Sequence, residues 1–374
     1  MKKRIALNCL GDNANWIGGI YYIKNIAFEI TTNNNINSKY DVYVFATNEN
    51  SKVFQNIHRV NVIKVSKKNK LLIPFLCYKY RIDFIYPYTH NIPFIGTKAI
   101  AWIPDFQHKY FESLFDKDEY DRRNKKFAYY SNKMPGLILS SKAAYNDFIK
   151  FFDKHRTNVQ ICRFVSYIEP ILKNSSISIE SDLLVKYNLM NVKYACIMNQ
   201  FWQHKNHMVV LEAMREYFHK NPESDFLFVF TGKLEDYRSP EYIDKLKIFF
   251  EEPLIKKHSI LLGFIDREEQ ILIMKNAEFV IQPSLFEGWG TVVEDAKVLD
   301  KTILLSDIPV HREQMNDKCI LFDPYDSGAL AELIKIECGK EHIDDVEKGI
   351  GDMYERAKEY SKGFEKLLKD LERK

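Results

Sequence analysis

The sequence has no apolar run long enough to cross a membrane. Its longest candidate, Leu71 to Tyr78, falls far short of the roughly 18 apolar residues that a membrane-spanning helix needs. Cysteine is scarce as well: six residues (9, 77, 162, 196, 319 and 338) are scattered along 374, and none forms a Cys-x-x-Cys pair. These absences predict free core thiols in a reducing cytoplasm, and they argue against a disulfide framework or a cysteine metal site.

The spacing Gly-x-Gly-x-x-Gly is also missing, which argues against a nicotinamide cofactor. The first residues are basic and then apolar, but the chain turns polar at Gly11, so we expect a first strand there rather than a signal peptide. With 374 residues, 46% hydrophobic and 28% charged, the chain is long enough for two globular domains, each with a full core.

Charge is distributed unevenly between the two halves. Residues 1–170 contain 26 Lys and Arg against 14 Asp and Glu, a net charge of +12, whereas the remaining residues contain 28 against 37, a net charge of −9. A basic first half suits an anionic partner such as a membrane surface or a lipid pyrophosphate. The alternative is that two solvated surfaces of opposite charge attract each other. No nucleic-acid recognition motif accompanies the charge, so nucleic acid is not expected as a partner.

A basic cluster, Lys67-Lys68-Asn69-Lys70, lies directly before the apolar run at residues 71–76. One interpretation is peripheral contact with an anionic bilayer, in which the lysines meet the headgroups and the apolar side chains reach the acyl boundary. The other is a basic loop that leads into a buried helix. The sequence leaves both open.

Short apolar runs alternate with longer helical patterns along the whole chain. In the first half the strand-like runs are Arg4–Leu10, Tyr40–Thr47, Asn61–Val65, Ile82–Tyr86, Lys98–Ile103, Leu137–Ser140 and Asn158–Phe164. In the second half they are Tyr194–Met198, Phe226–Thr231, Ser259–Leu262, Phe279–Gln282, Thr302–Ser306 and Cys319–Phe322. This alternation predicts an α/β fold with one doubly wound domain in each half, its parallel sheet covered by helices on both faces.

The boundary between the two domains is expected near residues 172 and 173, where the sequence turns polar. The tail from Gly349 to Lys374 predicts a charged amphipathic helix with a break at Gly363. Domains of this kind bind ligands at the carboxyl ends of their strands, so loops that follow strands are the places to look for function.

The most informative segment, Pro283–Ala296, follows a predicted strand and leads into a predicted helix. Glycines in its turn let backbone N–H groups approach a ligand closely, and the N-terminus of the helix favours negative charge. Acids beside those amides can bind hydroxyls next to a phosphate, and a phosphate flanked by hydroxyls describes a nucleotide-sugar. The turn and helix residues expected to contact it are Glu287, Gly288, Trp289, Gly290, Thr291, Glu294 and Asp295.

This segment resembles the acidic-pair motif of family 4 glycosyltransferases, which are retaining enzymes of the GT-B fold with two Rossmann-like domains facing a cleft. The resemblance implies that Glu287 contacts the donor sugar and that an acid eight positions later binds the nucleotide ribose. Asp295 stands at that position, and Glu294 lies one position earlier. The spacing of Thr291 and Glu294 fits a capping box, and helical phase puts Asp295 beside the buried face with Glu294 pointing away. Which acid binds the ribose stays open.

A second segment, Asn199–His207, follows the first predicted strand of the second half. It resembles the family loop that supplies an arginine and a lysine to the donor diphosphate, with Lys205 at the lysine position and Gln200 where the arginine would be. A missing charge-assisted hydrogen bond is worth about 1.5–3 kcal/mol. The first candidate to compensate is Lys233, next to Gly232 in the loop after the following strand.

Two further loops belong to the expected donor site. Phe264 and Ile265 end another strand and match the family segment that reads the base through backbone groups, although a plain strand-to-helix turn would look the same. In the first half, Gly18 and Gly19 precede a predicted helix and form a candidate phosphate cradle.

His108 follows the predicted strand Lys98–Ile103. The resemblance places a histidine in this stretch beside the donor sugar, near the reacting carbon, and Asp105 would orient it or bind the acceptor. The alternative is a structural histidine, which is the commoner role of an isolated one.

No metal site is expected. Asp116-Lys117-Asp118 has the Asp-x-Asp pattern of the metal-binding motif in the other glycosyltransferase fold, but it lies in a charged helical stretch and we interpret it as a helix start. His204 and His207 are three residues apart and lack a third ligand at helical spacing.

The resemblance covers nearly the whole chain and implies a retaining, metal-independent glycosyltransferase whose donor is a UDP- or GDP-sugar. Residues 1–172 would bind the acceptor and residues 173–350 the nucleotide-sugar, with 351–374 packing back towards the first domain. Glu287, Lys205 and His108 are the expected catalytic residues. The acceptors it implies are glycans or lipid-linked chains of O-antigen or capsule type, at the cytoplasmic face of the membrane.

Two other functions fit the same pattern. A nucleotide-sugar epimerase shares this twin-domain fold and changes its substrate without an acceptor. A catalytically inactive partner subunit is suggested by the departures from the family motif at Gln200 and Asp295.

Overall fold

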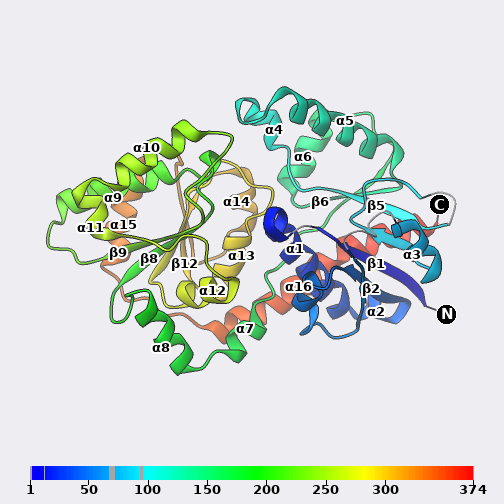
Figure 1. Ribbon diagram of the computed structural model, residues 1–374, viewed down its shortest axis with the longest axis horizontal. Helices are drawn as coiled ribbons and strands as arrows, with labels where there is room; N and C mark the ends of the chain where they lie inside the picture. Colours follow the sequence, from blue (N-terminus) through cyan, green and yellow to red (C-terminus); the bar gives the residue numbers. More distant parts are fainter. Residues whose placement is uncertain (1, 12, 67–71, 93–95, 374) are drawn as a thin grey trace. The chain divides into compact units, whose positions relative to one another are not determined.

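The structure is a computed structural model that describes residues 2–11, 13–66, 72–92 and 96–373 (Figure 1). Its internal contacts divide the chain into two compact units. Unit 1 comprises Met1–Tyr167 and Met353–Lys374, and unit 2 comprises Ile168–Asp352. The division lies a few residues before the boundary expected from the sequence, so that the short helix α7 (Glu169–Asn174) is part of unit 2.

Unit 1 is built on a seven-stranded sheet in the order β3-β2-β1-β4-β5-β6-β7, with neighbouring strands parallel. Its strands are β1 (Lys3–Cys9), β2 (Tyr40–Ala46), β3 (Val60–Lys64), β4 (Phe84–Tyr86), β5 (Lys98–Ile103), β6 (Gly136–Leu139) and β7 (Asn158–Ile161). Its helices are α1 (Asn13–Thr32), α2 (Asn34–Lys39), α3 (Ile73–Lys79), α4 (Gln107–Tyr110), α5 (Lys117–Lys133), α6 (Lys142–Phe151) and the C-terminal part of α16 (Val346–Glu372).

Unit 2 is built on a six-stranded sheet in the order β10-β9-β8-β11-β12-β13, again with parallel neighbours. Its strands are β8 (Tyr194–Met198), β9 (Leu227–Thr231), β10 (Ser259–Leu261), β11 (Phe279–Gln282), β12 (Thr302–Ser306) and β13 (Cys319–Phe322). After α7, its helices are α8 (Ile177–Lys186), α9 (His207–Lys220), α10 (Pro240–Phe250), α11 (Pro253–His258), α12 (Arg267–Lys275), α13 (Thr291–Val298), α14 (Pro309–Gln314) and α15 (Ser327–Cys338).

Both sheets have the strand order of a Rossmann fold, in which the first strand is central and the chain later reverses direction across the sheet. All thirteen strands expected from the sequence are present, and β5, β8, β11, β12 and β13 have the bounds expected. The doubly wound prediction is therefore confirmed. In unit 2 the order reverses between β8 and β11, and the carboxyl ends of these two strands are where such a sheet binds its ligand.

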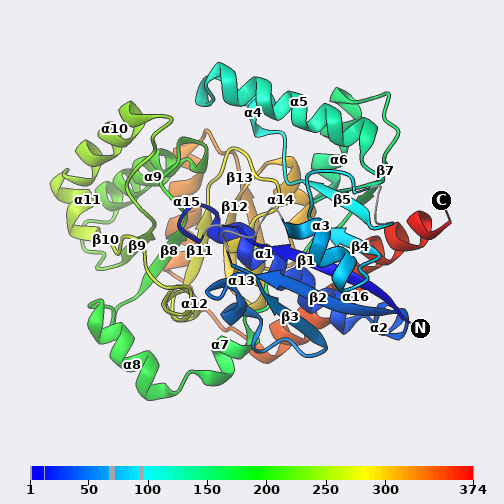
Figure 2. The ribbon, with the colours of Figure 1, turned by 45° about the vertical axis from the view of Figure 1, so that its right-hand side comes forward.

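The sheet of unit 2 is covered on both faces, with α9, α10, α11 and α15 on one side and α12 and α13 on the other (Figures 1 and 2). Helix α9 shows why it packs there, since Val210, Leu211, Met214 and Phe218 are buried at helical spacing. They join the aromatic core formed with β8, β9 and β11.

Helix α16 runs through Gly363 without the break expected from the sequence. A Cβ atom at Gly363 would lie 2.2 Å from the carbonyl oxygen of Ile161, so the glycine allows the helix to approach the end of β7. Further along, Leu367 and Leu371 pack against Gly136 of β6. The glycine is thus a packing requirement rather than a helix breaker, and Figure 2 shows the red end of α16 beside the sheet of unit 1.

Within the described part of the chain, no helix combines the length and apolar character needed to span a bilayer. The basic cluster at 67–70 lies outside the described residues. Helix α3 follows it and buries Ile73 and Cys77 in the core of unit 1, as expected for a buried helix. Its other face, with Leu72 at the N-cap, Phe75 and Tyr78, is 45%, 56% and 70% exposed.

Three loops at the carboxyl ends of β8, β9 and β10 are joined at Gly232. Its N–H donates to the carbonyl oxygen of Gly263 over 2.7 Å, and its φ of +114° lies in the region that favours glycine. A Cβ atom at this position would lie 2.4 Å from the carbonyl oxygen of Asn199. No side chain fits between these loops.

We expect Gly232→Ala to lower the free energy of unfolding of unit 2 by about 3 kcal/mol or more, because it combines backbone strain with a clash against backbone atoms. Gly263→Ala is the matched control: its φ is +68° but no atom lies within 4 Å of an added Cβ, so only about 1–2 kcal/mol of strain is expected. Urea unfolding measures both. Equal losses in the two variants would contradict the packing argument.

Candidate active site

The carboxyl ends of β8 and β11 are held together by side-chain and backbone hydrogen bonds. Asn199, just after β8, donates from Nδ2 to Oε1 of Gln282 at the end of β11 over 2.9 Å. Further out, the N–H of Leu285 donates to the carbonyl oxygen of His204 over 2.8 Å. The two segments singled out in the sequence therefore lie side by side at the point where the strand order reverses.

Glu287 is the centre of this arrangement. Its Oε1 accepts from Nζ of Lys205 at 2.5 Å, from Oγ of Ser284 at 2.7 Å and from Nε2 of Gln282 at 3.0 Å. The Glu287 and Lys205 side chains are only 11% and 15% exposed. Among the described residues no hydrogen bond reaches Oε2. One carboxylate oxygen is thus fixed by the protein and the other remains open as an acceptor.

The charge of Glu287 is fixed by its surroundings. Burial alone would raise the pKa of its carboxyl group, but the ammonium group of Lys205 outweighs burial and holds the pKa below its usual value. The carboxylate is therefore ionised at neutral pH and can only accept hydrogen bonds. Groups that donate to it, such as the hydroxyls of a sugar, are its natural ligands.

Four histidines of unit 2 are buried, and burial lowers the pKa of each, including His258. Burial lowers the pKa of His204 to about 3, of His207 to about 3 and of His311 to about 4. The ring of His207 stacks on Phe201 with centroids 4.3 Å apart, and neither of its nitrogens has a hydrogen-bond partner among the described residues. The described residues contain no group of three or more His, Cys, Asp or Glu side chains placed to hold a metal.

Gln200 ties two loops together through its side-chain amide. Its Oε1 accepts from the backbone N–H of Lys233 over 3.0 Å, and the Lys233 side chain itself is exposed. The structure brings a second cation, Arg238, to the same loops: its guanidinium lies 5.0 Å from the ring of Trp202 and is paired with Asp236 at 3.3 Å. Sequence reasoning missed Arg238, since no motif marks it.

The start of α13 is capped from outside. The N–H of Gly290 donates to Oε1 of Gln314 over 2.8 Å, and Gln314 returns a hydrogen bond to the carbonyl oxygen of Gly290 over 3.0 Å. Gly290 is the N-cap residue, and no side chain caps the helix from that position. The capping box expected from Thr291 and Glu294 is therefore wrong, because Gln314 of α14 takes that role.

Helix α13 begins with backbone donors that its own turns cannot satisfy. Its first intrahelical bond joins the N–H of Glu294 to the carbonyl oxygen of Gly290 at 3.2 Å. The N–H groups of Thr291, Val292 and Val293 precede that bond and have no carbonyl partner within the helix. They need an acceptor from outside the helix, and the helix dipole favours a negative one.

Glu294 and Asp295 are both fully buried, so the expectation that Glu294 points away from the core is wrong. Glu294 accepts from Lys297 and from Gln314, each at 3.1 Å. Asp295 forms an ion pair with the guanidinium of Arg267, at the start of α12. A helix buried on nearly every side leaves no solvent-facing position for either acid, and each carboxylate has a cationic partner instead.

The segment expected to read the base follows β10. Phe264 is 51% exposed and Ile265 is partly buried. Between them and the strand, Gly263 receives the hydrogen bond from Gly232 described above. Arg267 follows directly, so this loop leads from the exposed Phe264 to the partner of Asp295.

The candidate site residues of unit 1, Gly18, Gly19 and His108, lie within a helix or in the core rather than in an open loop. Gly18 and Gly19 lie inside α1 rather than before it, where helical hydrogen bonds engage their N–H groups, so the phosphate-cradle expectation is wrong. His108 is wholly buried among aromatic rings, and its Nε2 lies 3.1 Å from Oδ1 of Asn124. Burial lowers the pKa of His108. Its position is that of a packed side chain rather than one facing a ligand.

Two acids near His108 serve local structure. Asp105 accepts from the backbone N–H of Gln107 over 2.9 Å at the start of α4. Asp116 is the N-cap of α5 and accepts from the N–H of Glu119 over 2.7 Å. The interpretation of the Asp-x-Asp pattern as a helix start is confirmed.

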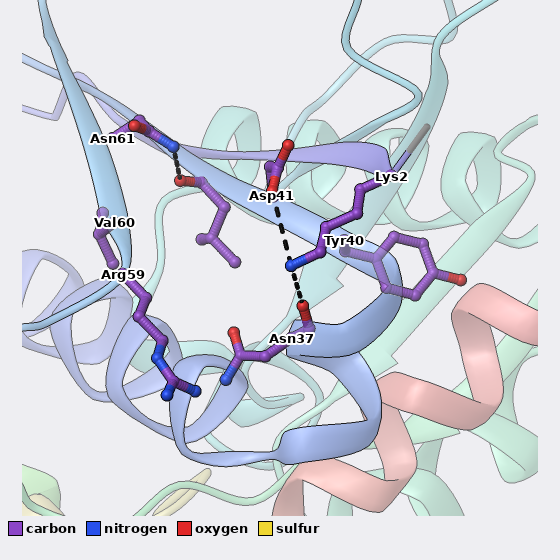
Figure 3. A pocket seen from close by; sticks show the side chains of 8 residues that line it. Lys2, Asn37, Tyr40, Asp41, Arg59, Val60 and Asn61 are labelled. Atoms are coloured by element: carbon purple, nitrogen blue, oxygen red, sulfur yellow. Dashed lines mark hydrogen bonds and ion pairs between the residues drawn. The ribbon is translucent and has the colours of Figure 1, made fainter.

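A polar pocket of about 400 Å³ lies at the opposite, amino-terminal edge of the unit 1 sheet (Figure 3). Lys2 lies between the carbonyl oxygen of Asn37 at 2.5 Å and the carboxylate of Asp41 at 3.9 Å. The pocket lies at the amino-terminal ends of β1, β2 and β3. Rossmann-like sheets bind their ligands at the opposite, carboxyl ends of the strands.

The buried neutral histidines make stability depend on pH. The unfolded chain protonates His207 below about pH 6.5, whereas the folded chain keeps it neutral down to its pKa of about 3. Stability is therefore lost as pH falls from about 6.5 towards 3. We expect His207→Phe, which preserves the stack on Phe201, to reduce the loss between pH 8 and pH 5 by about 2 kcal/mol.

Urea unfolding at the two pH values measures this effect. His219→Phe is the control, because His219 is exposed on the same helix. An unchanged pH dependence in His207→Phe would show that His207 is not held neutral.

The sequence of unit 2 matches a known family. Residues 185–362 match the family model described as Glycosyl transferases group 1, and this region contains Lys205, Glu287 and the start of α13. No curated protein sequence matches the chain.

Solved structures resemble the whole chain. A glycosyltransferase from Rickettsia africae ESF-5 has a TM-score of 0.64 at 14% identity, covering 99% of this chain and 97% of that one. Anabaena Alr3699/HepE in complex with UDP-glucose has a TM-score of 0.64 at 15% identity, with 99% and 98% covered. Sucrose-phosphate synthase from Thermosynechococcus elongatus has a TM-score of 0.63 at 12% identity, with 100% and 98% covered. The chain therefore has the GT-B fold, and its residues 185–362 are similar in sequence to the Glycosyl transferases group 1 family.

Proposed function

We propose that this protein is a retaining, metal-independent glycosyltransferase that moves a hexose from a nucleoside-diphosphate sugar to a glycan or lipid-linked acceptor. The observation that carries the proposal is the pair of Lys205 and Glu287 at the carboxyl ends of β8 and β11, with Oε2 of Glu287 open as an acceptor. Support also comes from the family match over residues 185–362 and from HepE, whose structure contains UDP-glucose.

The donor diphosphate would bind between Lys205 and the first N–H groups of α13. In the structure Lys205 is paired with Glu287, and the two phosphates of a donor would compete for that ammonium group. Once Lys205 turns to the diphosphate, Glu287 accepts hydrogen bonds from the sugar hydroxyls. Lys205 and the helix N-terminus then stabilise the negative charge that grows on the leaving diphosphate.

The transfer itself breaks the bond between the anomeric carbon and the diphosphate oxygen. The acceptor oxygen bonds to the same carbon from the face that the diphosphate leaves, and the acceptor proton passes to the diphosphate. Glu287 holds the sugar in place during this exchange, which is the contribution expected of an ionised carboxylate that cannot donate a proton.

The nucleotide would lie along the loops after β9 and β10. We assign the ribose to Asp295 together with its partner Arg267, because the Arg267 side chain is partly exposed, whereas Glu294 and its partner Lys297 are both buried. The exposed Phe264 and its neighbour Ile265 would meet the base. Arg238 and Lys233 are the cations that can compensate for Gln200.

We expect Lys205→Ala to weaken binding of the nucleoside diphosphate by about tenfold or more, since it removes a charge-assisted hydrogen bond. Glu287→Gln should keep that binding and lose sugar transfer. The measurements are calorimetric titration with UDP, GDP, ADP and dTDP in EDTA, and release of nucleoside diphosphate from the donor with a glycan or lipid extract as acceptor. Lys245→Ala and Glu241→Gln are the matched controls, since both residues are exposed on α10 and neither belongs to the proposed donor site.

The outcomes separate the alternatives. Binding of no nucleotide, or binding only with an added divalent metal, would contradict the proposed donor site. Conversion of the sugar nucleotide without an acceptor would support an epimerase of the same fold. Nucleotide binding without any turnover would support an inactive partner subunit.

We further propose that unit 1 rests on an anionic membrane at the cytoplasmic face, where lipid-linked acceptors of surface polysaccharides would be found. The supporting observations are the net charge of +12 over residues 1–170 and the exposed face of α3 formed by Leu72, Phe75 and Tyr78. Anionic bilayers bind surfaces on which apolar side chains lie next to basic ones.

If unit 1 makes this contact, a larger fraction of the protein should sediment with phosphatidylglycerol vesicles than with neutral vesicles. We expect the double change Phe75→Asp and Tyr78→Asp to reduce the bound fraction several-fold, because it places charge on the inserted face. Tyr237→Asp is the control, since Tyr237 is 84% exposed in unit 2. An equal loss in the control would contradict a contact made by α3.

A further inference from the structure

His311 is a buried histidine whose tautomer can be read from its neighbours. It lies on α14, after β12, and its Nδ1 is 2.9 Å from the carbonyl oxygen of Ser306. A carbonyl oxygen can only accept, so Nδ1 carries the hydrogen. The ring is neutral, since burial lowers the pKa of His311 to about 4, and its Nε2 therefore presents an unprotonated lone pair.

That lone pair has no partner. The side chain of His311 is fully buried, and no hydrogen bond to Nε2 exists among the described residues. Leaving a buried acceptor unpaired costs about 1–3 kcal/mol, and folded proteins rarely do so without a ligand or an ordered water. Because Nδ1 faces Ser306, Nε2 lies on the side of the ring away from β12.

His311 and Glu287 belong to the same buried polar cluster of unit 2. The charges of Glu287 and Lys205 both act on the imidazole. The two residues also share a hydrogen-bonded chain: Oγ of Ser306 donates to the carbonyl oxygen of Ser284 at 2.6 Å, and Oγ of Ser284 donates to Glu287 at 2.7 Å. An unpaired acceptor is thus linked, through Ser306 and Ser284, to the carboxylate that has one open oxygen.

We propose that His311 is a sugar-contacting residue whose Nε2 accepts a hydrogen bond from one hydroxyl of the donor sugar, while Glu287 accepts from another. The inference rests on the proposed function and defines the ligand more closely, as a sugar nucleotide with a free hydroxyl at the contacted carbon.

The consequence is selectivity against deoxy sugars. A neutral imidazole nitrogen without hydrogen can pair only with a donor, so a carbon that lacks its hydroxyl leaves Nε2 buried and unpaired. Sites built in this way reject the analogue that lacks the hydroxyl much more strongly than a hydrophobic pocket rejects a missing methylene.

The test is calorimetric binding of UDP and of UDP-glucose with its 2-, 3-, 4- and 6-deoxy analogues to the full-length protein. We expect one deoxy analogue to bind about tenfold more weakly than UDP-glucose to the wild type. His311→Asn keeps a donor near Ser306 and removes the acceptor at Nε2. It should bind UDP as the wild type does, and it should bind that analogue and UDP-glucose equally.

Two further variants separate contact from indirect effects. His258→Asn is the matched control: His258 is also buried, with its Nδ1 3.0 Å from the carbonyl oxygen of Phe226, and it should leave every affinity unchanged. Ser284→Ala removes the hydroxyl that bonds Glu287 and leaves both contacts between Nδ1 of His311 and Ser306 in place. If Ser284→Ala erased the discrimination as His311→Asn does, His311 would act by positioning Glu287, and the proposed contact would be overturned.

The failures are distinguishable. Full discrimination retained in His311→Asn would overturn the inference while UDP binding still supported the donor site. A wild type that binds neither UDP nor any of the sugar nucleotides would overturn the proposed function itself, and the inference with it.

Discussion

The ion pair of Lys205 and Glu287 is the interaction on which the site of unit 2 depends. Both side chains are largely withdrawn from water, so each charge needs the other or a ligand in its place. Gln282 and Ser284 fix the carboxylate from the β11 side, and Lys205 reaches it from the loop after β8. The pair therefore joins the two strand ends where the sheet reverses, and it holds the site in shape before any ligand arrives.

The helix that follows Glu287 is organised by buried charges rather than by its own cap. Glu294 pairs with Lys297, and Asp295 pairs with Arg267, so both acids of α13 are neutralised inside the protein. Gln314 holds both backbone groups of Gly290. Because these partners come from α12, α13 and α14, the first N–H groups of α13 are oriented by the whole domain, and little reorganisation is needed when an anion binds.

The sequence predicted the fold well because its signals are local. Buried parallel strands are short apolar runs with turns at both ends, and each of the thirteen was recognisable. Lys205 and Glu287 were found through motifs that follow such strands, and the structure brings their side chains together.

The errors concern groups whose role is decided by distant residues. The capping box failed because Gln314, 24 positions after Gly290, takes that place. The helix break predicted at Gly363 is wrong because the glycine is there for packing: a Cβ atom would clash with the carbonyl oxygen at the end of β7. The surroundings of His108, the direction of Glu294 and the presence of Arg238 and His311 depend on tertiary packing that no periodicity records.

Helix α14 is only six residues long, yet it carries both His311 and Gln314, which are three positions apart on neighbouring turns. His311 is linked through Ser306 and Ser284 to the carboxylate of Glu287, and Gln314 holds the start of the helix whose first amides can bind an anion. A change in the length of the β12–α14 connection would therefore displace both at once. Variation in that short connection among related chains would alter sugar preference and leaving-group affinity together, so the two properties would evolve as one.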